Sequence, residues 1–247
     1  MSSSPFSSFI LDHPSPYPFY VFAGPCSAET EEQTLETARA LRAGGICFFR
    51  ASLWKPRTRP GSFEGVGKQG LPWLVRVKEE LGMQVATEIA SPQHAEVALK
   101  AGLDTFWIGA RTTASPFAVS ELAEALAGTD ARILVKNPLN PDIDLWEGAL
   151  LRLQQVGVKS IGAIHRGFST YAPGIYRNAP LWQLPIELQR RHPDLTIFVD
   201  PSHMAGRREL VPLLCQVGLE MNFAGLMVET HPTPSMAWSD AAQQLTP

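Results

Sequence analysis

Short apolar runs alternate with longer amphipathic segments along the chain from residue 19 onward. Eight of these runs have the length and the β-branched and aromatic content of buried strands. They cover residues 19–23, 46–51, 84–88, 104–110, 132–136, 160–165, 196–200 and 224–229. The segments between them repeat apolar residues at helical spacing, and most end in the glycine that commonly follows a helix. This alternation predicts parallel strands joined by crossover helices.

The number of these units predicts the fold class. Eight strand–helix units within residues 19–247 match a closed (β/α)8 TIM barrel, an α/β fold. An open doubly wound sheet is disfavoured because the sequence lacks the glycine fingerprint of dinucleotide-binding sheets. Residues 1–18 are rich in Ser and Pro, so we expect an extended N-terminal arm ahead of one catalytic barrel over residues 19–247. Few residues follow the last strand, and we expect a truncated eighth helix.

Composition and charge exclude several classes of protein. The chain has 247 residues, of which 45% are hydrophobic and 18% charged, a composition typical of folded globular proteins. With 21 basic and 24 acidic residues the formal net charge is −3, so we expect no nucleic acid and no membrane as a partner. The first basic residue is Arg39, so the positive segment of a secretory signal is missing and we expect a cytoplasmic protein.

Reactive side chains follow nearly every predicted strand. In a (β/α)8 barrel the carboxyl ends of the strands meet at one face, where active sites are built. Six basic residues fall there, namely Arg50, Lys55, Arg57, Arg111, Lys136 and Arg166. Positive charge concentrated at one mouth favours the binding of compact anions such as phosphate and carboxylate. The alternative is that some of these side chains lie on a solvated rim, as charged residues commonly do.

A second group of strand-end residues has the chemistry of metal ligands. Cys26, His203 and Glu229 offer a thiolate, an imidazole and a carboxylate, which suit a divalent transition metal, and Asp240 is a candidate fourth ligand. Their spacing is not a local metal-binding signature, and a lone cysteine is often a small buried apolar residue instead. His165, Asp200 and His231 are candidates either for chemistry or for orienting neighbouring side chains.

An ordered series of motifs in this sequence resembles one enzyme family. The motifs are GPCSAE at 24–29, KPRT at 55–58, ATE at 86–88, IGAR at 108–111, VKN at 135–137, HRG at 165–167, DPSH at 200–203 and VETHP at 228–232. Together they resemble the 3-deoxy-D-arabino-heptulosonate 7-phosphate (DAHP) synthases, barrel enzymes at the entry to the shikimate pathway. KNPLNPD and IGAIHRGFS further resemble the branch of that family fused to a C-terminal chorismate mutase domain.

The resemblance implies a reaction and a metal. Members of the family condense phosphoenolpyruvate with erythrose 4-phosphate and release inorganic phosphate. The resemblance makes Cys26, His203, Glu229 and Asp240 the ligands of a divalent metal ion, with Mn favoured among Mn, Fe, Co and Zn. A homo-oligomer, dimer or tetramer, is expected, because a missing last helix would expose apolar barrel surface. A covalent or separate chorismate mutase domain is a further expected partner.

The resemblance also implies roles for the cationic residues. Arg50 and Lys55 would hold the carboxylate and reacting centre of phosphoenolpyruvate, and Arg57 and Thr58 the phosphate of the sugar. The phosphate of phosphoenolpyruvate would be held by Arg111, Lys136, Arg166 and the backbone N–H beside Ala110. Glu88 would lie by the water and the proton transfers. Lys55, Glu88 and His203 are therefore the expected catalytic residues.

Departures from the family pattern leave two alternatives open. RPGSFEG at 59–65 stands where the family often has SPYSFQG, which puts the shape of the sugar-phosphate loop in doubt at Arg59. One alternative is 3-deoxy-octulosonate 8-phosphate synthase, which shares the barrel but typically carries KANRS in place of KPRT. The other is a truncated, non-catalytic module that binds phosphoenolpyruvate or a chorismate mutase partner.

Overall fold

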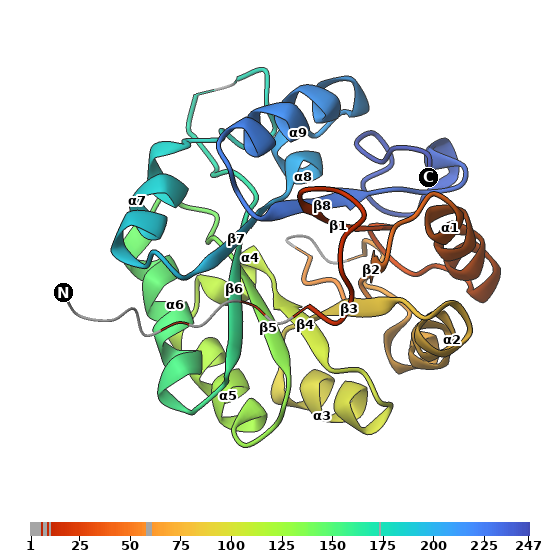
Figure 1. Ribbon diagram of the computed structural model, residues 1–247, viewed down its shortest axis with the longest axis horizontal. Helices are drawn as coiled ribbons and strands as arrows, with labels where there is room; N and C mark the ends of the chain where they lie inside the picture. Colours follow the sequence, from red (N-terminus) through yellow and green to blue (C-terminus); the bar gives the residue numbers. More distant parts are fainter. Residues whose placement is uncertain (1–5, 7–8, 10, 58–60, 173) are drawn as a thin grey trace.

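Eight parallel strands close into a barrel in the computed structural model, which describes residues 6, 9, 11–57, 61–172 and 174–247. The strands are β1 Tyr20–Gly24, β2 Phe48–Arg50, β3 Gln84–Ile89, β4 Thr105–Ile108, β5 Arg132–Lys136, β6 Ser160–His165, β7 Thr196–Val199 and β8 Gly225–Glu229. Each pairs with the next in chain order, and β8 pairs with β1 to complete the ring (Figure 1). The predicted (β/α)8 TIM barrel is confirmed.

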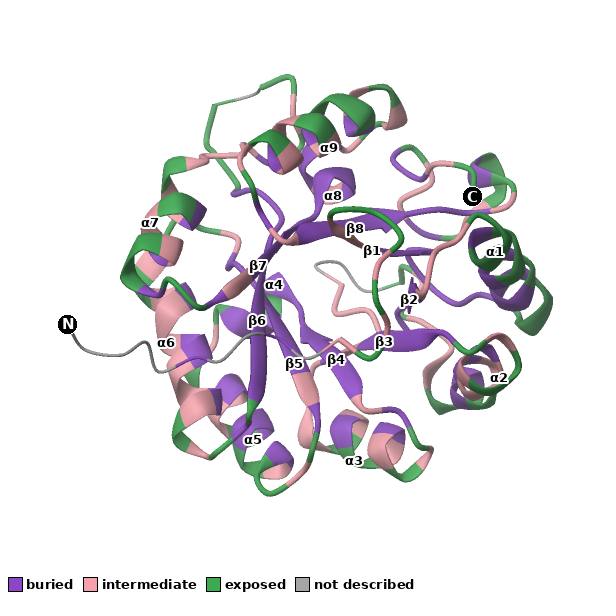
Figure 2. Ribbon diagram, viewed as in Figure 1, coloured by how far each residue is buried: buried purple, intermediate pink, exposed green. Residues whose placement is uncertain are grey.

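Helices surround this ring with their buried faces turned inward and their exposed faces outward (Figure 2). The crossover helices are α1 Glu31–Ala43, α2 Leu71–Leu81, α3 Pro92–Lys100, α5 Pro116–Leu126, α6 Ile143–Gln155, α7 Gln183–Arg191 and α9 Val211–Glu220. Short helices α4 Ala110–Thr113 and α8 Pro201–Ala205 directly follow β4 and β7, and single 3-10 turns lie at η1 Gly67–Gly70, η2 Arg208–Leu210 and η3 Pro234–Met236. No helix among the described residues has the length and apolar character needed to cross a bilayer.

Buried side chains from every strand fill the interior of the barrel. They are Phe22, Phe48, Ala86, Trp107, Leu134, Ile164, Phe198 and Met227, all buried. Phe9, from the segment before β1, joins this cluster and meets the ring of Phe198 edge-on at 6.1 Å. The backbone N–H of Phe9 donates to Thr196 at the first residue of β7. The segment before β1 therefore packs across the amino ends of the strands, opposite the face where active sites form.

The chain after β8 runs back across the carboxyl end of the barrel. From Thr230 to Pro247, all of which the structure describes, the chain forms no α-helix, only η3, turns and one isolated β-bridge. Leu245 instead pairs with Thr230 and exchanges backbone hydrogen bonds of 2.9 Å with Glu229 and His231. The expected short eighth helix is thus replaced by a folded-back segment that brings Asp240 and its neighbours beside β1 and β8.

Candidate active site

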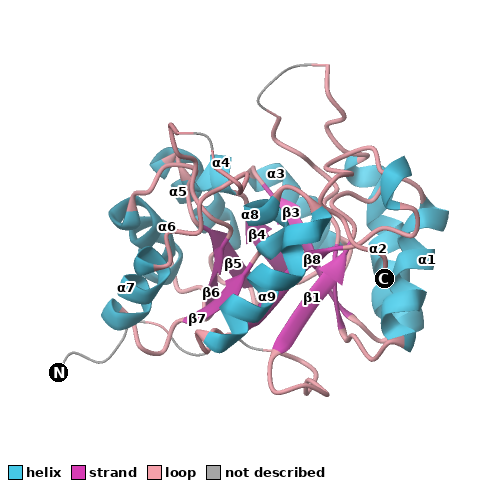
Figure 3. Cartoon of the chain, turned by 90° about the horizontal axis from the view of Figure 1, so that it is seen from above, coloured by secondary structure: helices cyan, strands magenta, loops and turns pink. Residues whose placement is uncertain are grey.

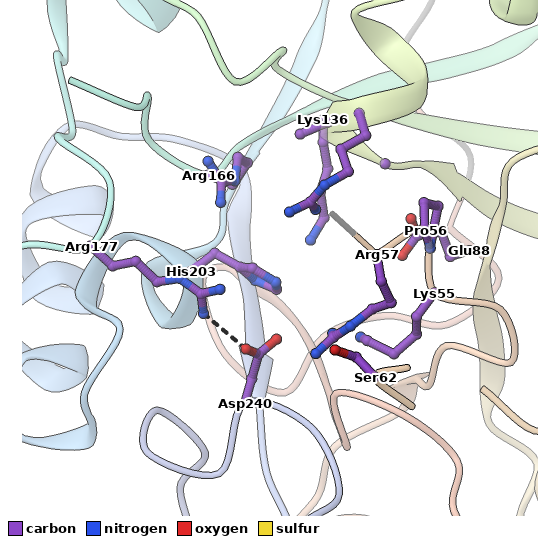
Figure 4. A pocket seen from close by; sticks show the side chains of 13 residues that line it. Lys55, Pro56, Arg57, Ser62, Glu88, Lys136, Arg166, Arg177, His203 and Asp240 are labelled. Atoms are coloured by element: carbon purple, nitrogen blue, oxygen red, sulfur yellow. Dashed lines mark hydrogen bonds and ion pairs between the residues drawn. The ribbon is translucent and has the colours of Figure 1, made fainter. Parts of the chain in front are cut away.

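A cavity of about 290 Å³ opens at the carboxyl ends of the strands. It is lined by Lys55, Pro56, Arg57, Ser62, Glu88, Gly109, Ala110, Arg111, Lys136, Arg166, Arg177, His203 and Asp240 (Figure 4). The βα loops that supply these residues extend from one end of the barrel, away from the N-terminal segment (Figure 3). Most of the residues predicted for the site are therefore brought together around one space. Thr58, also predicted for it, and Arg59 lie outside the described residues.

Three of the four predicted metal ligands form a compact cluster beside the cavity. Ligand atoms of Cys26, Glu229 and Asp240 all lie within 4.8 Å of one another. The Cys26 thiol donates to Asp240 Oδ2 at 3.2 Å. His203, the fourth, has Nε2 3.7 Å from Glu229 Oε1. Sulfur, carboxylate and imidazole donors at these separations fit a divalent transition metal.

The cluster is buried, and this changes the state of its thiol. Burial, reinforced by the negative charge of Glu229, raises the pKa of the Cys26 thiol to about 12. Lys55 Nζ lies 2.9 Å from Cys26 Sγ and also donates to the Cys26 carbonyl. Burial lowers the pKa of Lys55, but interaction with Cys26 and with the carboxylates of the cavity, Glu229 foremost, outweighs this and raises it, so Lys55 is a cation. A bound divalent cation would likewise favour the thiolate of Cys26.

Arg50 lies beneath the cavity rather than in its lining. Its side chain is 1% exposed and donates to Glu229 Oε1 at 3.2 Å and to the Cys26 carbonyl at 3.1 Å. The guanidinium also lies 4.7 Å above the ring of Trp107. In this arrangement Arg50 holds the Cys26 loop and the Glu229 carboxylate together. Its predicted contact with a substrate carboxylate stays a prediction.

Asp200 orients two of the cavity residues from below. Lys136 Nζ donates to Asp200 Oδ2 at 2.7 Å, and His203 Nδ1 lies 2.8 Å from the same oxygen. Burial works against ionisation of Asp200, but His203 and Lys136 outweigh it and hold the pKa of this carboxyl well below its usual range. Burial lowers the pKa of His203. When the neutral imidazole carries its proton on Nδ1, which faces Asp200, the other ring nitrogen Nε2 is unprotonated. Its lone pair is then directed toward Glu229.

Glu88 and Arg166 are fixed on opposite sides of the cavity. Glu88 Oε2 accepts hydrogen bonds from Ser52 Oγ at 3.0 Å and from Trp107 Nε1 at 3.2 Å. A Cβ at Gly109 would lie 2.1 Å from Glu88 Oε1, so any side chain there would displace the Glu88 carboxylate from this position. Arg166 Nη1 donates to Asn178 Oδ1 at 2.7 Å, and burial lowers the pKa of Arg166 to about 10, which leaves it charged at neutral pH.

Arg177 is a cavity residue that the sequence reasoning missed. It lies in the connection between β6 and α7, and its Nη1 donates to Asp240 Oδ1 and to Gln243 Oε1, both at 2.9 Å. Gln243 in turn donates to Glu229 Oε2 at 2.6 Å. One signal was present in the sequence, since the connection is long for a barrel loop and carries an Arg-Asn pair.

The fold and the cavity define a (β/α)8 barrel whose mouth is lined by cationic side chains beside a candidate metal cluster. The family model described as DAHP synthetase I family matches residues 15–247. The chain therefore belongs to the DAHP synthetase I family.

Individual relatives include members with two different names. The chain is 33% identical over 231 residues to a phospho-2-dehydro-3-deoxyheptonate aldolase of Thermotoga maritima, with 92% of this chain and 65% of the relative covered. It is 32% identical over 244 residues to a 2-dehydro-3-deoxyphosphooctonate aldolase of Polaromonas naphthalenivorans, with 90% and 83% covered. The chain thus spans less than two thirds of the length of the Thermotoga relative.

Solved structures support the same assignment. The crystal structure of the Thermotoga maritima DAHP synthase superposes with a TM-score of 0.85 at 30% identity, covering 98% of this chain and 69% of that one. A truncated form of the Thermotoga enzyme gives a TM-score of 0.82 at 28% identity, with 98% and 87% covered. The barrel described above is therefore the fold of the matched part of these structures.

Proposed function

We propose that this chain condenses phosphoenolpyruvate with erythrose 4-phosphate and water to give DAHP and inorganic phosphate. One observation carries the proposal: six cationic side chains line a single cavity next to the Cys26, His203, Glu229 and Asp240 cluster. They are Lys55, Arg57, Arg111, Lys136, Arg166 and Arg177. Two phosphates and one carboxylate provide matching negative charge.

The cations divide the cavity into two sides. Arg166 and Lys136 lie together on one side, and Arg57 and Lys55 lie near Ser62 on the other (Figure 4). We assign the phosphate of phosphoenolpyruvate to the first side, with Arg111 and Ala110, and the sugar phosphate to Arg57. Lys55, beside Cys26, then lies between the two substrates, where the new carbon–carbon bond must form.

The side chains of the cavity supply the proton transfers of this reaction. C3 of phosphoenolpyruvate attacks the aldehyde carbon of the sugar, and Lys55 donates a hydrogen bond to the oxygen that becomes an alkoxide. Water adds at C2 and gives one proton to Glu88, from which a proton passes to the alkoxide of the sugar. The C2–O bond to phosphate then breaks while the new C2 hydroxyl becomes the ketone and gives its proton to the departing phosphate. A divalent metal held by Cys26, His203, Glu229 and Asp240, with Mn favoured over Fe, Co and Zn, would polarise the aldehyde oxygen.

Turnover by the whole chain tests the proposal. Purified protein is freed of metal with a chelator and assayed for phosphate release and DAHP formation with both substrates, alone and with each divalent metal. We expect activity that needs erythrose 4-phosphate and is restored by metal, and we expect Glu88→Gln to lower kcat at least tenfold, as is usual for a general base. Phosphoenolpyruvate binding without phosphate release would instead support a non-catalytic module.

A second candidate is 3-deoxy-octulosonate 8-phosphate synthesis, in which arabinose 5-phosphate replaces erythrose 4-phosphate. It is favoured by the Polaromonas relative, whose name denotes that activity and of which 83% is covered. KPRT at 55–58 argues against it. Turnover of arabinose 5-phosphate without turnover of erythrose 4-phosphate would reverse our choice. The homo-oligomer and the chorismate mutase partner stay predictions of the sequence.

A further inference from the structure

Gln243 is a buried side chain whose two amide atoms are both committed to charged neighbours. It is 1% exposed and does not line the cavity. Its Nε2 donates to Glu229 Oε2 at 2.6 Å, and its Oε1 accepts from Arg177 Nη1 at 2.9 Å. Arg177 Nη1 also donates to Asp240 Oδ1 at 2.9 Å. Gln243 and Arg177 thus connect the carboxylates of Glu229 and Asp240.

These bonds occupy one oxygen of each carboxylate and leave the other turned toward the cluster. The remaining oxygen of Glu229, Oε1, lies 3.7 Å from His203 Nε2. The remaining oxygen of Asp240, Oδ2, lies 3.2 Å from Cys26 Sγ. Arg50 also donates to Glu229 Oε1 at 3.2 Å, so Glu229 is oriented by Arg50 and Gln243 together, and Asp240 is oriented by Arg177, which Gln243 contacts.

We propose that Gln243 is a positioning residue that turns Glu229 and, through Arg177, Asp240 toward a shared divalent metal ion. A neutral amide suits this place because it donates to one carboxylate while accepting from the guanidinium that holds the other. A carboxylate at position 243 would repel Glu229, and an apolar side chain would leave buried polar atoms without partners. The inference rests on the metal requirement of the proposed function.

The backbone around Gln243 is itself fixed to the first βα loop. The neighbouring Gln244 accepts from the backbone N–H of Cys26 at 3.2 Å and donates to the carbonyl of Ser239 at 2.9 Å. Asp240 has a left-handed backbone with φ of +48°. The turn that contains Gln243 is therefore held in place by contacts other than the Gln243 side chain. Replacing the amide of Gln243 should leave the backbone of this turn where it is.

Metal binding without substrates is the direct test. The chain is stripped of metal, and the dissociation constant for Mn²⁺ is measured from the electron paramagnetic resonance signal of the free ion. Gln243→Met keeps the length of the side chain and removes the amide, and Gln243→Asn keeps the amide but withdraws it. We expect both to weaken Mn²⁺ binding by about 10- to 100-fold, the usual cost of losing a group that orients a metal ligand.

Two controls separate positioning from loss of fold. Gln216→Met, at an exposed glutamine of α9, should leave Mn²⁺ binding unchanged, and all variants should keep the circular dichroism spectrum of the parent. Because Gln243 and Arg177 act in one chain of hydrogen bonds, Gln243→Met combined with Arg177→Met should weaken binding less than the product of the single effects. Multiplicative effects would show that the two residues act independently and would overturn the proposed connection.

The outcomes distinguish this inference from the proposed function. A folded Gln243→Met protein that binds Mn²⁺ as tightly as the parent would overturn the role of Gln243 and leave the proposed reaction standing. A parent chain that binds none of the divalent metals would overturn both the metal requirement and the role of Gln243. Parent binding without turnover would reject the reaction alone.

Discussion

Arg57 and Arg166 line the same cavity but serve different predicted substrates. Arg166 is held by Asn178 on one side of the cavity, whereas Arg57 lies across it near Ser62 (Figure 4). We expect Arg57→Ala to raise KM for erythrose 4-phosphate about 10- to 100-fold, because a charged hydrogen bond contributes about 1.5–3 kcal/mol. KM for phosphoenolpyruvate should change much less.

Steady-state kinetics with each substrate varied in turn checks this prediction. Lys100→Ala, which removes an exposed cation of α3 far from the mouth, is the matched control and should change neither KM. A larger effect of Arg57→Ala on phosphoenolpyruvate would mean that the two subsites are exchanged.

Burial of His165 makes the unfolding free energy of the protein decrease as the pH falls. The ring is buried among Phe168 and Trp182, at centroid distances of 5.6 and 5.2 Å, and burial lowers its pKa from 6.5 to about 3. As pH falls below 6.5 the unfolded chain takes up a proton that the folded chain refuses, so stability is lost between about pH 6.5 and 3. We expect His165→Leu to remove up to about 1.4 kcal/mol per pH unit of this dependence.

Urea unfolding of both proteins at a series of pH values from 8 to 4 measures the effect. The quantity to compare is the difference in unfolding free energy between the variant and the parent, which should shift in favour of the variant as pH falls. A difference that stays constant with pH would mean that burial does not shift the pKa of His165 from its value in the unfolded chain.

The sequence located the cavity residues that immediately follow strands, because the strand ends of a barrel are fixed in space by its closure. Lys136 and Arg166 are cases of this kind, adjoining β5 and β6. Arg177 and Gln243 could not be found in the same way. Their positions depend on how a long loop and the segment after β8 fold back, and that conformation is set by contacts far apart in sequence, such as that of Gln244 with Cys26.

At the scale of elements, the segment before β1 closes the amino end of the barrel. Phe9 contacts Phe198 inside the barrel and is 5% exposed. Removing a buried phenyl ring typically costs about 3–5 kcal/mol, so we expect Phe9→Ala to lower the unfolding free energy toward that range. Because the active cavity lies at the opposite end, both KM values should stay within about twofold of the parent.

Chemical unfolding and kinetics on the same preparation check this pair of expectations. Phe117→Ala is the matched control, because Phe117 is 85% exposed on α5 and its removal should change stability little. A Phe9→Ala protein of unchanged stability would show that the segment does not close the barrel.

The segment after β8 also touches the loop that carries Arg57. The ring of Trp238 meets that of Phe63 edge-on at 5.2 Å, and the backbone N–H of Trp238 donates to Glu29 at 2.7 Å. This contact joins the predicted sugar-phosphate loop to the segment that bears Asp240. We expect Trp238→Ala to raise KM for erythrose 4-phosphate about fivefold, since an aromatic pair contributes about 0.5–1.5 kcal/mol beyond its buried area.

The same segment offers a control for that prediction. Met236 is 69% exposed, and Met236→Ala should leave both KM values unchanged. Equal effects of Trp238→Ala on the two substrates would contradict a role confined to the sugar-phosphate loop. Initial rates at saturating concentration of the second substrate give both constants.

Helices and strands with a clear periodic pattern of apolar residues could be predicted from the sequence. Short helices that depend on one capping residue could not. The eight strands follow from apolar runs that are long enough to be distinctive. The short helices α4 and α8 depend on local geometry instead: Gly109 precedes α4, and Asp200 caps α8 by accepting from the backbone N–H of His203. The structure after β8 was expected to be a short helix, but backbone pairing of Leu245 with β8 and its neighbours prevails there.

Across the whole molecule, charge is distributed very unevenly. The chain has a net charge of −3, yet six Lys and Arg side chains line one cavity of about 290 Å³. Dissolved salt screens such a field and competes for the same cations. We expect KM for both substrates to rise about threefold or more between about 50 and 500 mM NaCl, because the Debye length falls from about 14 to about 4 Å over that range.

Rates measured across this series, with kcat followed separately, check the expectation. Sodium sulfate at equal ionic strength should raise KM further than NaCl does, because sulfate resembles the phosphate groups of the two proposed substrates. KM values that change with neither salt would contradict electrostatic binding of the two anionic substrates in this cavity.

Closure of the ring has a consequence for how the protein is made. Cys26 follows the first strand and Asp240 the last, 214 positions later, and the two meet only where β8 pairs with β1. A nascent chain emerging from the ribosome therefore carries its thiol through most of synthesis with no carboxylate beside it. Any ion that this whole cluster retains must therefore be acquired after the last strand has docked, and its uptake would report that the barrel is complete.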